Sequence, residues 1–458
     1  MVVMLTVALI TVGEGALSSV GERFYALQYD GPGKFWDEVL GRMVWGRSPF
    51  ESPMALFWLK PLRVRVVRTW AKVQDFHPKP GEWIWKGVDR PVREIVKAGF
   101  EVLLCLNQGS GSWFVGDERK PWWEFDEGRR EWEAAARALA ERFEGKAVMI
   151  EIFNEPNLLH KERPNYMGWE RSVELYLLAA RAIKQVAPSI LCGGPASWAG
   201  WETAEWGKRV LSRPGGERLL DFLSYHIYTT HKIDEPDEVV MARTPWFEEA
   251  PLYISREMGK VTKKRILRAL TEFNFSAVCE RDGKAWTDPR NRNALGGVWL
   301  ASALLHSAKG GCDIAFHFST QGGFGVLVWP PNWRPWPAYY AWRLLVEGAG
   351  LLPGAKILEC TTTEEARRTA SVKLPVYDLE PFAIRRTDGG VSVVLVNRTK
   401  RPIKAEVCWP AEAREVEVYV FSTERVADSL WPVRRRKREG KWLDIDCPPI
   451  SVTVLRFE

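Results

Sequence analysis

The chain has few histidines and no paired cysteine motif. Its six histidines are dispersed and form no HExxH sequence, which argues against a catalytic metal. Its seven cysteines are odd in number, include no CxxC pair and mostly stand in apolar, strand-like runs such as LLCL. This pattern is typical of buried free thiols in a reducing compartment. We therefore expect a cytoplasmic protein that needs no metal or other cofactor.

Long apolar runs are also missing. No stretch approaches 18 consecutive apolar residues, so no membrane span is expected. The first residues, MVVMLTVALITVGEGA, lack the basic segment that opens a signal peptide. Their content of Val, Ile and Thr favours a β-strand over a retained signal. Only five glutamines accompany abundant Arg and Glu, as is typical of thermophilic proteins.

Neither sign of charge dominates, because 64 basic and 58 acidic side chains leave a net charge of +6. The one basic run, RRRKR at 434–438, is flanked by Pro432 and Gly440 between two strand-like segments. We interpret it as a solvated hairpin turn rather than a nucleic-acid contact. With 46% apolar and 27% charged residues, the 458-residue chain is typical of a soluble globular protein with one large and one smaller domain.

Between residues 24 and 350, eight short apolar runs alternate with longer helical patterns. The runs are FYALQYD (24–30), RVRVVRTW (63–70), EVLLCLN (101–107), AVMIEIFNE (147–155), ILCGGPA (190–196), LLDFLSYHIY (219–228), RILRALTEFN (265–274) and CDIAFHFST (312–320). Near-continuous apolar strands indicate a parallel sheet buried on both faces. Eight strand–helix units favour an α/β fold of the (β/α)8 TIM-barrel type, with its chemistry at the carboxyl ends of the strands. An open doubly wound sheet is the alternative, but no glycine-rich phosphate turn follows the first run.

The pattern changes at about residue 352 to short alternating runs such as VSVVLVNRT and REVEVYVFS, separated by Gly, Pro and basic turns. These runs predict an antiparallel β-sandwich. We expect the N-terminal strand to join it. The predicted organisation is therefore an N-terminal strand at 1–20, a catalytic barrel at 21–351 and an accessory β-sandwich domain at 352–458.

Two glutamates follow apolar runs at the predicted active end of the barrel. Glu155 ends the fourth run in IEIFNEPN, and Glu272 ends the seventh in LTEFNF. A buried glutamate is costly unless it is paired or used, and for either one alone an ion pair with an arginine would suffice. Two glutamates from facing strand ends are what cleavage of a glycosidic bond requires, because one carboxyl protonates the leaving oxygen and the other acts at the anomeric carbon.

With these motifs the chain resembles the clan A retaining glycoside hydrolases, whose barrels carry the acid/base after strand four and the nucleophile after strand seven. IEIFNEPN, LTEFN and the sixth-strand segment DFLSYHIY are most similar to those of glycoside hydrolase family 39, which includes β-xylosidases and α-L-iduronidases. The resemblance covers residues 24–350 and the β-sandwich. Phe153 and Phe273 stand where the family usually has Trp, and these departures bear on substrate choice.

The resemblance implies a role for each residue of these motifs. Glu155 would be the general acid and then base, and Glu272 the nucleophile. Arg68 and Tyr228 would keep Glu272 ionised, and Asn154 would bind the sugar 2-hydroxyl.

Further side chains near the strand ends could contact a sugar. His226 shares a strand face with Tyr228, so we favour a contact with substrate or nucleophile over a packed histidine satisfied by the backbone. Of the 24 tryptophans, Trp70 and Trp329 are predicted to stack on sugar faces, whereas many of the others pack loops against helices. The polar side chains of Asp75, Asn107 and Gln108 could bind hydroxyl groups.

The predicted function is therefore hydrolysis of glycosidic bonds by a retaining β-glycosidase (EC 3.2.1.-), of β-xylosidase or β-glucosidase/galactosidase type. Two alternatives stay open. A transglycosylase would use the same site and intercept the same intermediate with a sugar, and a non-catalytic carbohydrate-binding barrel would use it without chemistry. The expected partner is an oligosaccharide or glycoside, and a homo-oligomer is compatible with the sequence.

Overall fold

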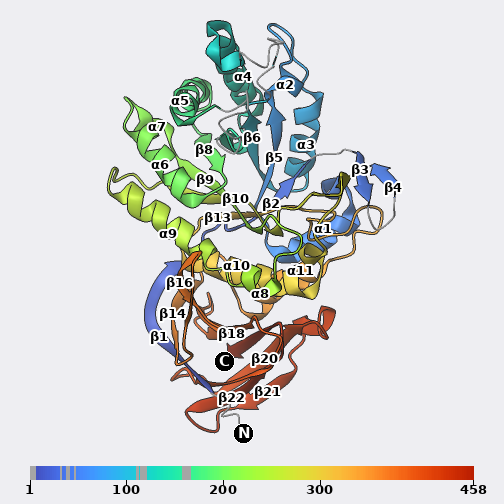
Figure 1. Cartoon of the computed structure of the whole chain (residues 1–458), viewed down its shortest axis with the longest axis vertical. Coiled ribbons are helices and arrows are strands. Elements are labelled where there is room, and N and C mark those ends of the chain that lie inside the picture. Colours follow the sequence, from blue (N-terminus) through green and yellow to red (C-terminus); the bar gives the residue numbers. More distant parts are fainter. Residues whose placement is uncertain are drawn as a thin grey trace.

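A closed barrel of eight parallel strands forms the larger part of the protein (Figure 1). The computed structural model describes residues 7–30, 34–37, 42–45, 48–109, 113, 121–156 and 167–458, with 34–37, 42–45 and Ala285 as backbone alone. The barrel strands, in the order in which they pair, are β2 (Tyr25–Tyr29), β5 (Val66–Lys72), β6 (Glu101–Asn107), β7 (Ala147–Ile152), β8 (Leu191–Ser197), β9 (Phe222–Thr230), β10 (Leu267–Ser276) and β13 (Ile314–His317). Because β13 pairs with β2, the sheet closes. The predicted TIM barrel is confirmed, and the open sheet is excluded.

Helices surround the barrel. They are α1 (Pro53–Leu59), α2 (Val73–Phe76), α3 (Lys86–Lys97), α4 (Asp126–Phe143), α5 (Trp169–Val186), α6 (Gly200–Leu211), α7 (Gly216–Leu219), α8 (Asp237–Met241), α9 (Trp246–Gly259), α10 (Ala294–Lys309) and α11 (Pro337–Arg343), which continues into a π-helical turn at Leu344–Gly348. Short 3-10 turns lie at Pro49–Glu51, Lys60–Leu62, Trp122–Glu124, Pro289–Arg292 and Ala427–Leu430. Within the described residues, none of these helices is long and apolar enough to span a membrane.

A nine-stranded sheet forms the second domain. Its strands, in spatial order, are β21 (Arg434–Lys437), β20 (Glu415–Ser422), β23 (Ser451–Phe457), β18 (Val391–Asn397), β17 (Leu379–Arg385), β14 (Lys356–Thr362), β1 (Ala8–Ser19), β19 (Ile403–Cys408) and β22 (Trp442–Cys447). The strand from the start of the chain thus lies between β14 and β19. It pairs parallel with β19, so the sheet is mixed rather than purely antiparallel.

The basic run at 434–438 is not a turn, contrary to the prediction. Its residues Arg434–Lys437 form the edge strand β21, paired antiparallel with β20, and the turn follows it. Four consecutive basic residues suit an edge strand, because long charged side chains discourage further strands from pairing there.

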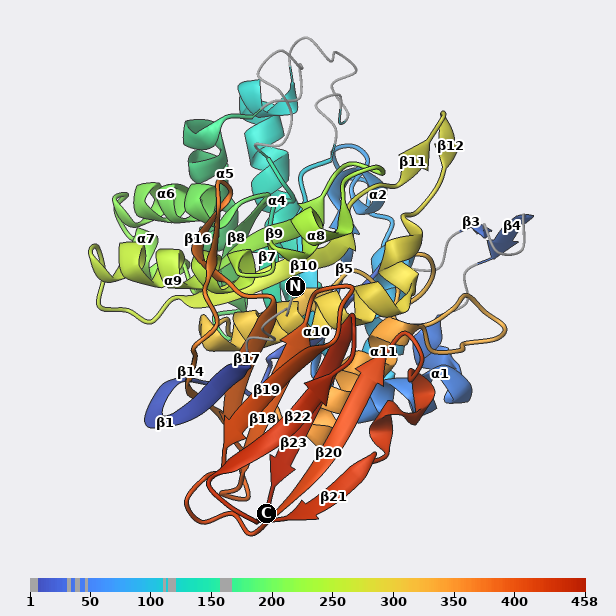
Figure 2. The same ribbon diagram turned by 60° about the horizontal axis from the view of Figure 1, so that its bottom comes forward.

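The two domains meet at α10 and α11 (Figures 1 and 2). Residues 295–308 of α10 are buried all round, as expected of a helix packed between a barrel and a sheet. A polar cluster crosses this interface. His306 on α10 contacts Glu248 of α9 through Nδ1 at 2.8 Å and Glu380 of β17 through Nε2 at 2.6 Å. Arg398 forms a further ion pair with Glu380.

Among the residues that the structure describes, three hairpins lie outside the two main sheets. They are β3 (Lys34–Asp37) with β4 (Arg42–Trp45), β11 (Glu280–Arg281) with β12 (Lys284–Ala285), and β15 (Arg367–Thr369) with β16 (Val372–Val376). The β15–β16 hairpin belongs to the second domain by sequence, but it rises from that domain toward α9 of the barrel (Figure 2). Through this hairpin the second domain reaches the pocket, because Ser371, Lys373 and Leu374 are among the residues that line it.

Candidate active site

The fully buried guanidinium of Arg68, on β5, joins the polar groups at the carboxyl end of the barrel. Its Nε donates to Glu151 Oε2 at 2.7 Å, its Nη1 to Glu272 Oε1 at 2.7 Å and its Nη2 to Asn154 Oδ1 at 2.8 Å. Burial alone would lower the pKa of Arg68, but the charges of Glu151 and Glu272 raise it well above its ordinary value. A permanent cation is therefore held between two carboxylates in the barrel core.

Glu272 receives a second donor from the neighbouring strand. It lies within β10, opposite a register irregularity with β9, and is only 8% exposed. The Tyr228 hydroxyl donates to its Oε2 at 2.9 Å. Burial, followed by the charge of Glu272, raises the pKa of Tyr228 well above its ordinary value, so the phenol stays protonated and remains a donor. Arg68 and Tyr228 thus hold one oxygen each of the Glu272 carboxylate.

Glu155 lies on the turn that follows β7. Its backbone N–H donates to Ala196 O at 3.1 Å at the end of β8. Phe153 and Glu155 both have left-handed backbone conformations, with φ of 83° and 50°. Each such residue costs about 1–3 kcal/mol, and strain of this kind is typical of active-site turns. The turn presents a Glu155 side chain that is 19% exposed.

His226 on β9 bridges the two glutamates. Its Nδ1 lies 2.7 Å from Glu155 Oε1 and 3.8 Å from Glu272 Oε2. The distance between Glu155 Oε1 and Glu272 Oε2 must therefore be smaller than the sum of these two distances. Burial lowers the pKa of His226, but the charge of Glu272 and the hydrogen bond with Glu155 outweigh it and raise the pKa above its ordinary value. His226 thus contacts both predicted catalytic groups.

Gln108 positions the turn rather than facing the pocket. Its Nε2 donates to Asn154 O at 3.0 Å, and its Oε1 accepts from Asn154 N at 3.0 Å. Asn107 Oδ1 accepts from Gly109 N at 2.9 Å, and Asp75 is exposed on α2. Gln108, Asn107 and Asp75 are absent from the described residues that line the pocket. The hydroxyl-binding role predicted for these three therefore has no support from their placement.

A pocket of about 1640 Å³ opens over the two glutamates, and Glu155, His226, Tyr228 and Glu272 form part of its wall. Aromatic side chains cover much of the rest: Trp198, Trp201, Trp246, Tyr253, Trp286, Phe318, Phe324, Trp329 and Trp336. Trp329, which was predicted to stack on a sugar face, is one of these lining residues. Concave sites with aromatic walls and a few convergent polar groups are typical of small-molecule sites.

Trp70, the other tryptophan predicted to stack on sugar, is not among the described residues that line the pocket. It contacts two residues of the site instead. Its Nε1 donates to Asp30 Oδ1 at 3.0 Å, and the Arg68 guanidinium lies 4.6 Å from its ring centroid. Asp30, which the sequence did not single out, follows the first barrel strand and lines the pocket.

The two aromatic departures from the resembled family lie away from the pocket. Phe153 is fully buried and stacks on Trp132, with centroids 5.5 Å apart and planes at 2°. Phe273 is fully buried against Phe247, with centroids 5.6 Å apart. Both rings fill space between strands and helices, so neither forms part of the described pocket wall.

Solved structures share this whole architecture. The α-L-arabinofuranosidase of Thermotoga maritima, in complex with arabinose, superposes with a TM-score of 0.69 at 15% identity over 98% of this chain and 99% of that one. The GH51 arabinofuranosidase of Xanthomonas axonopodis pv. citri gives 0.68 at 14% over 98% and 99%. A monomeric β-xylosidase of Caulobacter crescentus CB15 gives 0.61 at 16%, again over 98% and 99%. The chain shares with these proteins a TIM barrel joined to a C-terminal β domain.

Sequence comparison adds nothing to this. No protein-family model matches the chain, and no curated protein sequence does.

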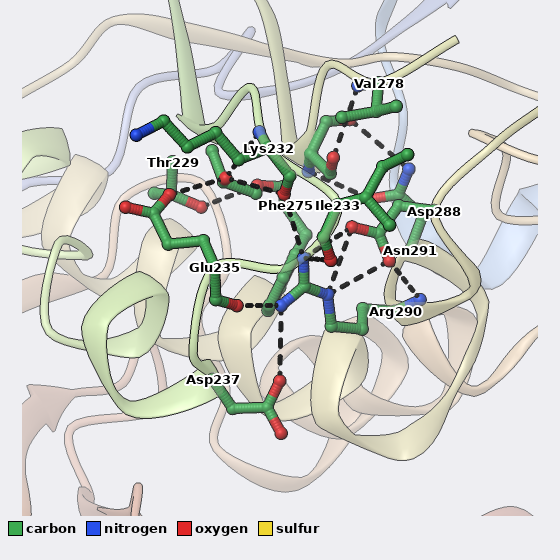
Figure 3. Close-up of polar contacts among 12 residues, drawn as sticks. Thr229, Lys232, Ile233, Glu235, Asp237, Phe275, Val278, Asp288, Arg290 and Asn291 are labelled. Carbon is green, nitrogen blue, oxygen red and sulfur yellow. Dashed lines mark hydrogen bonds and ion pairs between the residues drawn. The ribbon is translucent and has the colours of Figure 1, made fainter. Parts of the chain in front are cut away.

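Arg290 links the loop after β10 to the loop after β9 at the rim of the pocket (Figure 3). Arg290, in the loop after β10, donates to the backbone oxygens of Lys232 at 3.3 Å, Ile233 at 3.2 Å and Glu235 at 2.6 Å, all in the loop after β9. Its Nη2 also pairs with Asp288 at 2.7 Å. Burial lowers the pKa of Arg290, but the contacts with Asp288 raise it above its ordinary value.

The next residue fastens the rim to the barrel. Asn291 Oδ1 accepts from Ser276 N at 3.0 Å at the end of β10. His231 and Lys232, from the loop after β9, line the pocket. Arg290 and Asn291 therefore set the position of one pocket wall relative to the strand that carries Glu272.

Proposed function

We propose that the protein is a retaining glycosidase in which Glu272 is the nucleophile and Glu155 the acid/base. The main support is that Glu155 and Glu272 both contact His226 but have different surroundings. Glu272 is bound by the Arg68 cation and the Tyr228 hydroxyl, whereas Glu155 contacts His226 and is the more exposed of the two. A carboxylate held by a cation suits a nucleophile, and a more loosely held carboxyl suits proton exchange.

In the first step, Glu272 attacks the anomeric carbon and forms a glycosyl ester, while Glu155 gives its proton to the departing oxygen. In the second step, Glu155 removes a proton from water, whose oxygen attacks the same carbon and releases Glu272. This pathway needs carboxyl groups about 5–5.5 Å apart, and the shared contact with His226 Nδ1 supports that short spacing.

The sugar is proposed from two sources. The resemblance to family 39 favours β-xylosides, and the solved structures that share the fold are named for arabinofuranosidase and xylosidase activities. We therefore propose a pentoside substrate, with β-glucosides and β-galactosides as the next candidates.

The test is turnover of aryl glycosides of xylose, arabinofuranose, glucose and galactose by the wild type and by Glu272→Ala and Glu155→Ala. Both variants should lose most activity. Azide should rescue Glu155→Ala and give a glycosyl azide of retained configuration, because the ester with Glu272 still forms. With Glu272→Ala, azide should give the inverted product, because it replaces the nucleophile. Near-wild-type turnover by Glu272→Ala would contradict the proposal.

A further inference from the structure

The geometry of Glu155 defines the side of the pocket on which the leaving group lies, given the proposed function. The general acid must reach the departing oxygen, so the sugars beyond that oxygen lie on the Glu155 side. The backbone N–H of Glu155 donates to Ala196 O at 3.1 Å, which places the end of β8 next to it. The segment that follows β8 is therefore the first wall that leaving-group sugars would meet.

That segment carries two exposed indoles. Trp198 and Trp201 line the pocket and are 46% and 55% exposed, with ring centroids 6.3 Å apart and planes at 81°. Leaving large apolar rings in contact with water is unfavourable. Exposed rings that lie together inside a pocket therefore indicate a surface that binds a ligand. Indole faces suit the apolar C–H faces of sugar rings.

The same wall continues along α9. Helices α6 and α9 pack closely, since a Cβ on Gly200 would lie 2.7 Å from the Cβ of Ala250. This brings Leu252, which is 46% exposed, and Tyr253 into the same pocket.

The β15–β16 hairpin of the second domain closes the outer end. Oε1 of Glu249, on α9, accepts from Lys373 N at 2.5 Å and Leu374 N at 2.7 Å. Trp246 Nε1 donates to Ser371 O at 2.6 Å. Three contacts to hairpin backbone fix this segment against the barrel, and Ser371, Lys373 and Leu374 all line the pocket that contains the glutamates.

We infer that Trp198, Trp201, the exposed side of α9 and residues 371–374 form an outer binding site for the leaving-group sugars of an oligosaccharide. The pocket volume of about 1640 Å³ supports this, because a site for one drug-sized ligand takes about 300–1,000 Å³. The second domain thereby contributes directly to substrate binding. The protein acts on sugar chains in preference to glycosides with a small leaving group.

The test compares an aryl glycoside with a tetrasaccharide that ends in the same sugar. The double variant Trp198→Ala/Trp201→Ala should lower kcat/KM for the tetrasaccharide about tenfold more than for the aryl glycoside, because only the longer substrate reaches both indoles. A hairpin variant, Lys373→Ala/Leu374→Ala, should also lower kcat/KM more for the tetrasaccharide than for the aryl glycoside. The difference between the two losses should be smaller than in the double tryptophan variant. Trp431→Ala is the matched control, because Trp431 is 71% exposed on the second domain and is absent from the described pocket lining.

Equal losses on both substrates, or no loss on either, would overturn the outer site. So would a wild type that cleaves aryl glycosides but binds no tetrasaccharide. If the wild type cleaves no glycoside, the proposed activity is wrong, and titration calorimetry with xylotetraose, cellotetraose and mannotetraose then decides the outer site separately. Binding of one of them that weakens about tenfold in the double tryptophan variant supports the site. Binding that does not change, or no binding at all, refutes it.

Discussion

The Arg68 Nε atom lies 2.7 Å from Glu151 Oε2, and both side chains are fully buried. This pair accounts for a charged residue near the end of the otherwise apolar strand β7. It also gives Arg68 a second carboxyl partner, so Glu272 is not the only acidic group that the guanidinium binds. The structure therefore separates the structural carboxylate of this strand, Glu151, from Glu155 four residues later.

Replacing Glu151 by alanine should lower the free energy of unfolding by about 3–5 kcal/mol, because it leaves Arg68 with less compensation in the barrel core. Urea denaturation followed by far-UV circular dichroism measures the change. Glu141→Ala, at an exposed position of α4, is the control and should change stability by less than about 0.5 kcal/mol. Equal stability of the two variants would contradict the assignment of Glu151 as a structural ion-pair partner.

Replacing Tyr228 by phenylalanine should lower kcat by about 10- to 100-fold. A hydrogen bond to a charged group contributes about 1.5–3 kcal/mol, and this one is made to the proposed nucleophile. Tyr176→Phe is a matched control, because that buried hydroxyl donates to Leu219 O at 2.9 Å outside the site. We expect Tyr176→Phe to lose stability and keep its kcat. The assignment fails if kcat falls in parallel with stability in both variants.

The barrel and the two strand-end glutamates could be predicted from the sequence because both signals are local. Apolar runs alternate with helical patterns along the chain, and Asn154 and Glu155 stand directly after the core of one such run. The same local logic did not find Glu151, because the sequence does not show which glutamate of IEIFNE pairs with Arg68. For Gln108, the sequence indicated a position near the site but not the role of the side chain. Gln108 makes two hydrogen bonds to the backbone of Asn154, and these form only when β6 and β7 pair.

The outer parts of the site had no local signal at all. Glu249 binds backbone N–H groups more than 120 residues further along the chain, in a hairpin whose own sequence resembles any exposed turn. Arg290 likewise contacts carbonyl oxygens in a loop that follows another strand. Backbone donors and acceptors are the same at almost every residue and carry no sequence information, so such contacts become visible only in the folded chain.

The buried cluster at the domain interface predicts a dependence of stability on pH. Burial lowers the pKa of His306, but Glu380 and Glu248 outweigh it and raise the pKa above its ordinary value. A group whose pKa is raised by folding stabilises the protein fully below its unfolded pKa and loses that effect as the pH rises through the folded pKa. The unfolding free energy of the wild type should therefore fall, relative to His306→Gln, as the pH rises from about 6 through the raised value.

Urea denaturation of both proteins at a series of pH values measures this difference. The carboxylates act in the opposite direction, because the lowered pKa of Glu248 gives stability that is lost in acid. The comparison is therefore made above pH 6, where these carboxylates stay ionised. A constant difference between wild type and His306→Gln across that range would show that the histidine is not charged in the interface.

Arg290 should affect substrate binding through the loop at the rim of the pocket. Arg290→Lys keeps the charge but removes the planar fork that reaches three carbonyl oxygens and Asp288 at once, so the loop after β9 should lose its fixed position. Because this loop carries His231 and Lys232 into the pocket, and not the glutamates, we expect KM to rise several-fold with a smaller change in kcat. Arg414→Lys, exposed in the second domain, should change neither constant. A fall in kcat with unchanged KM would instead place Arg290 in support of Glu272, through Asn291 and the end of β10.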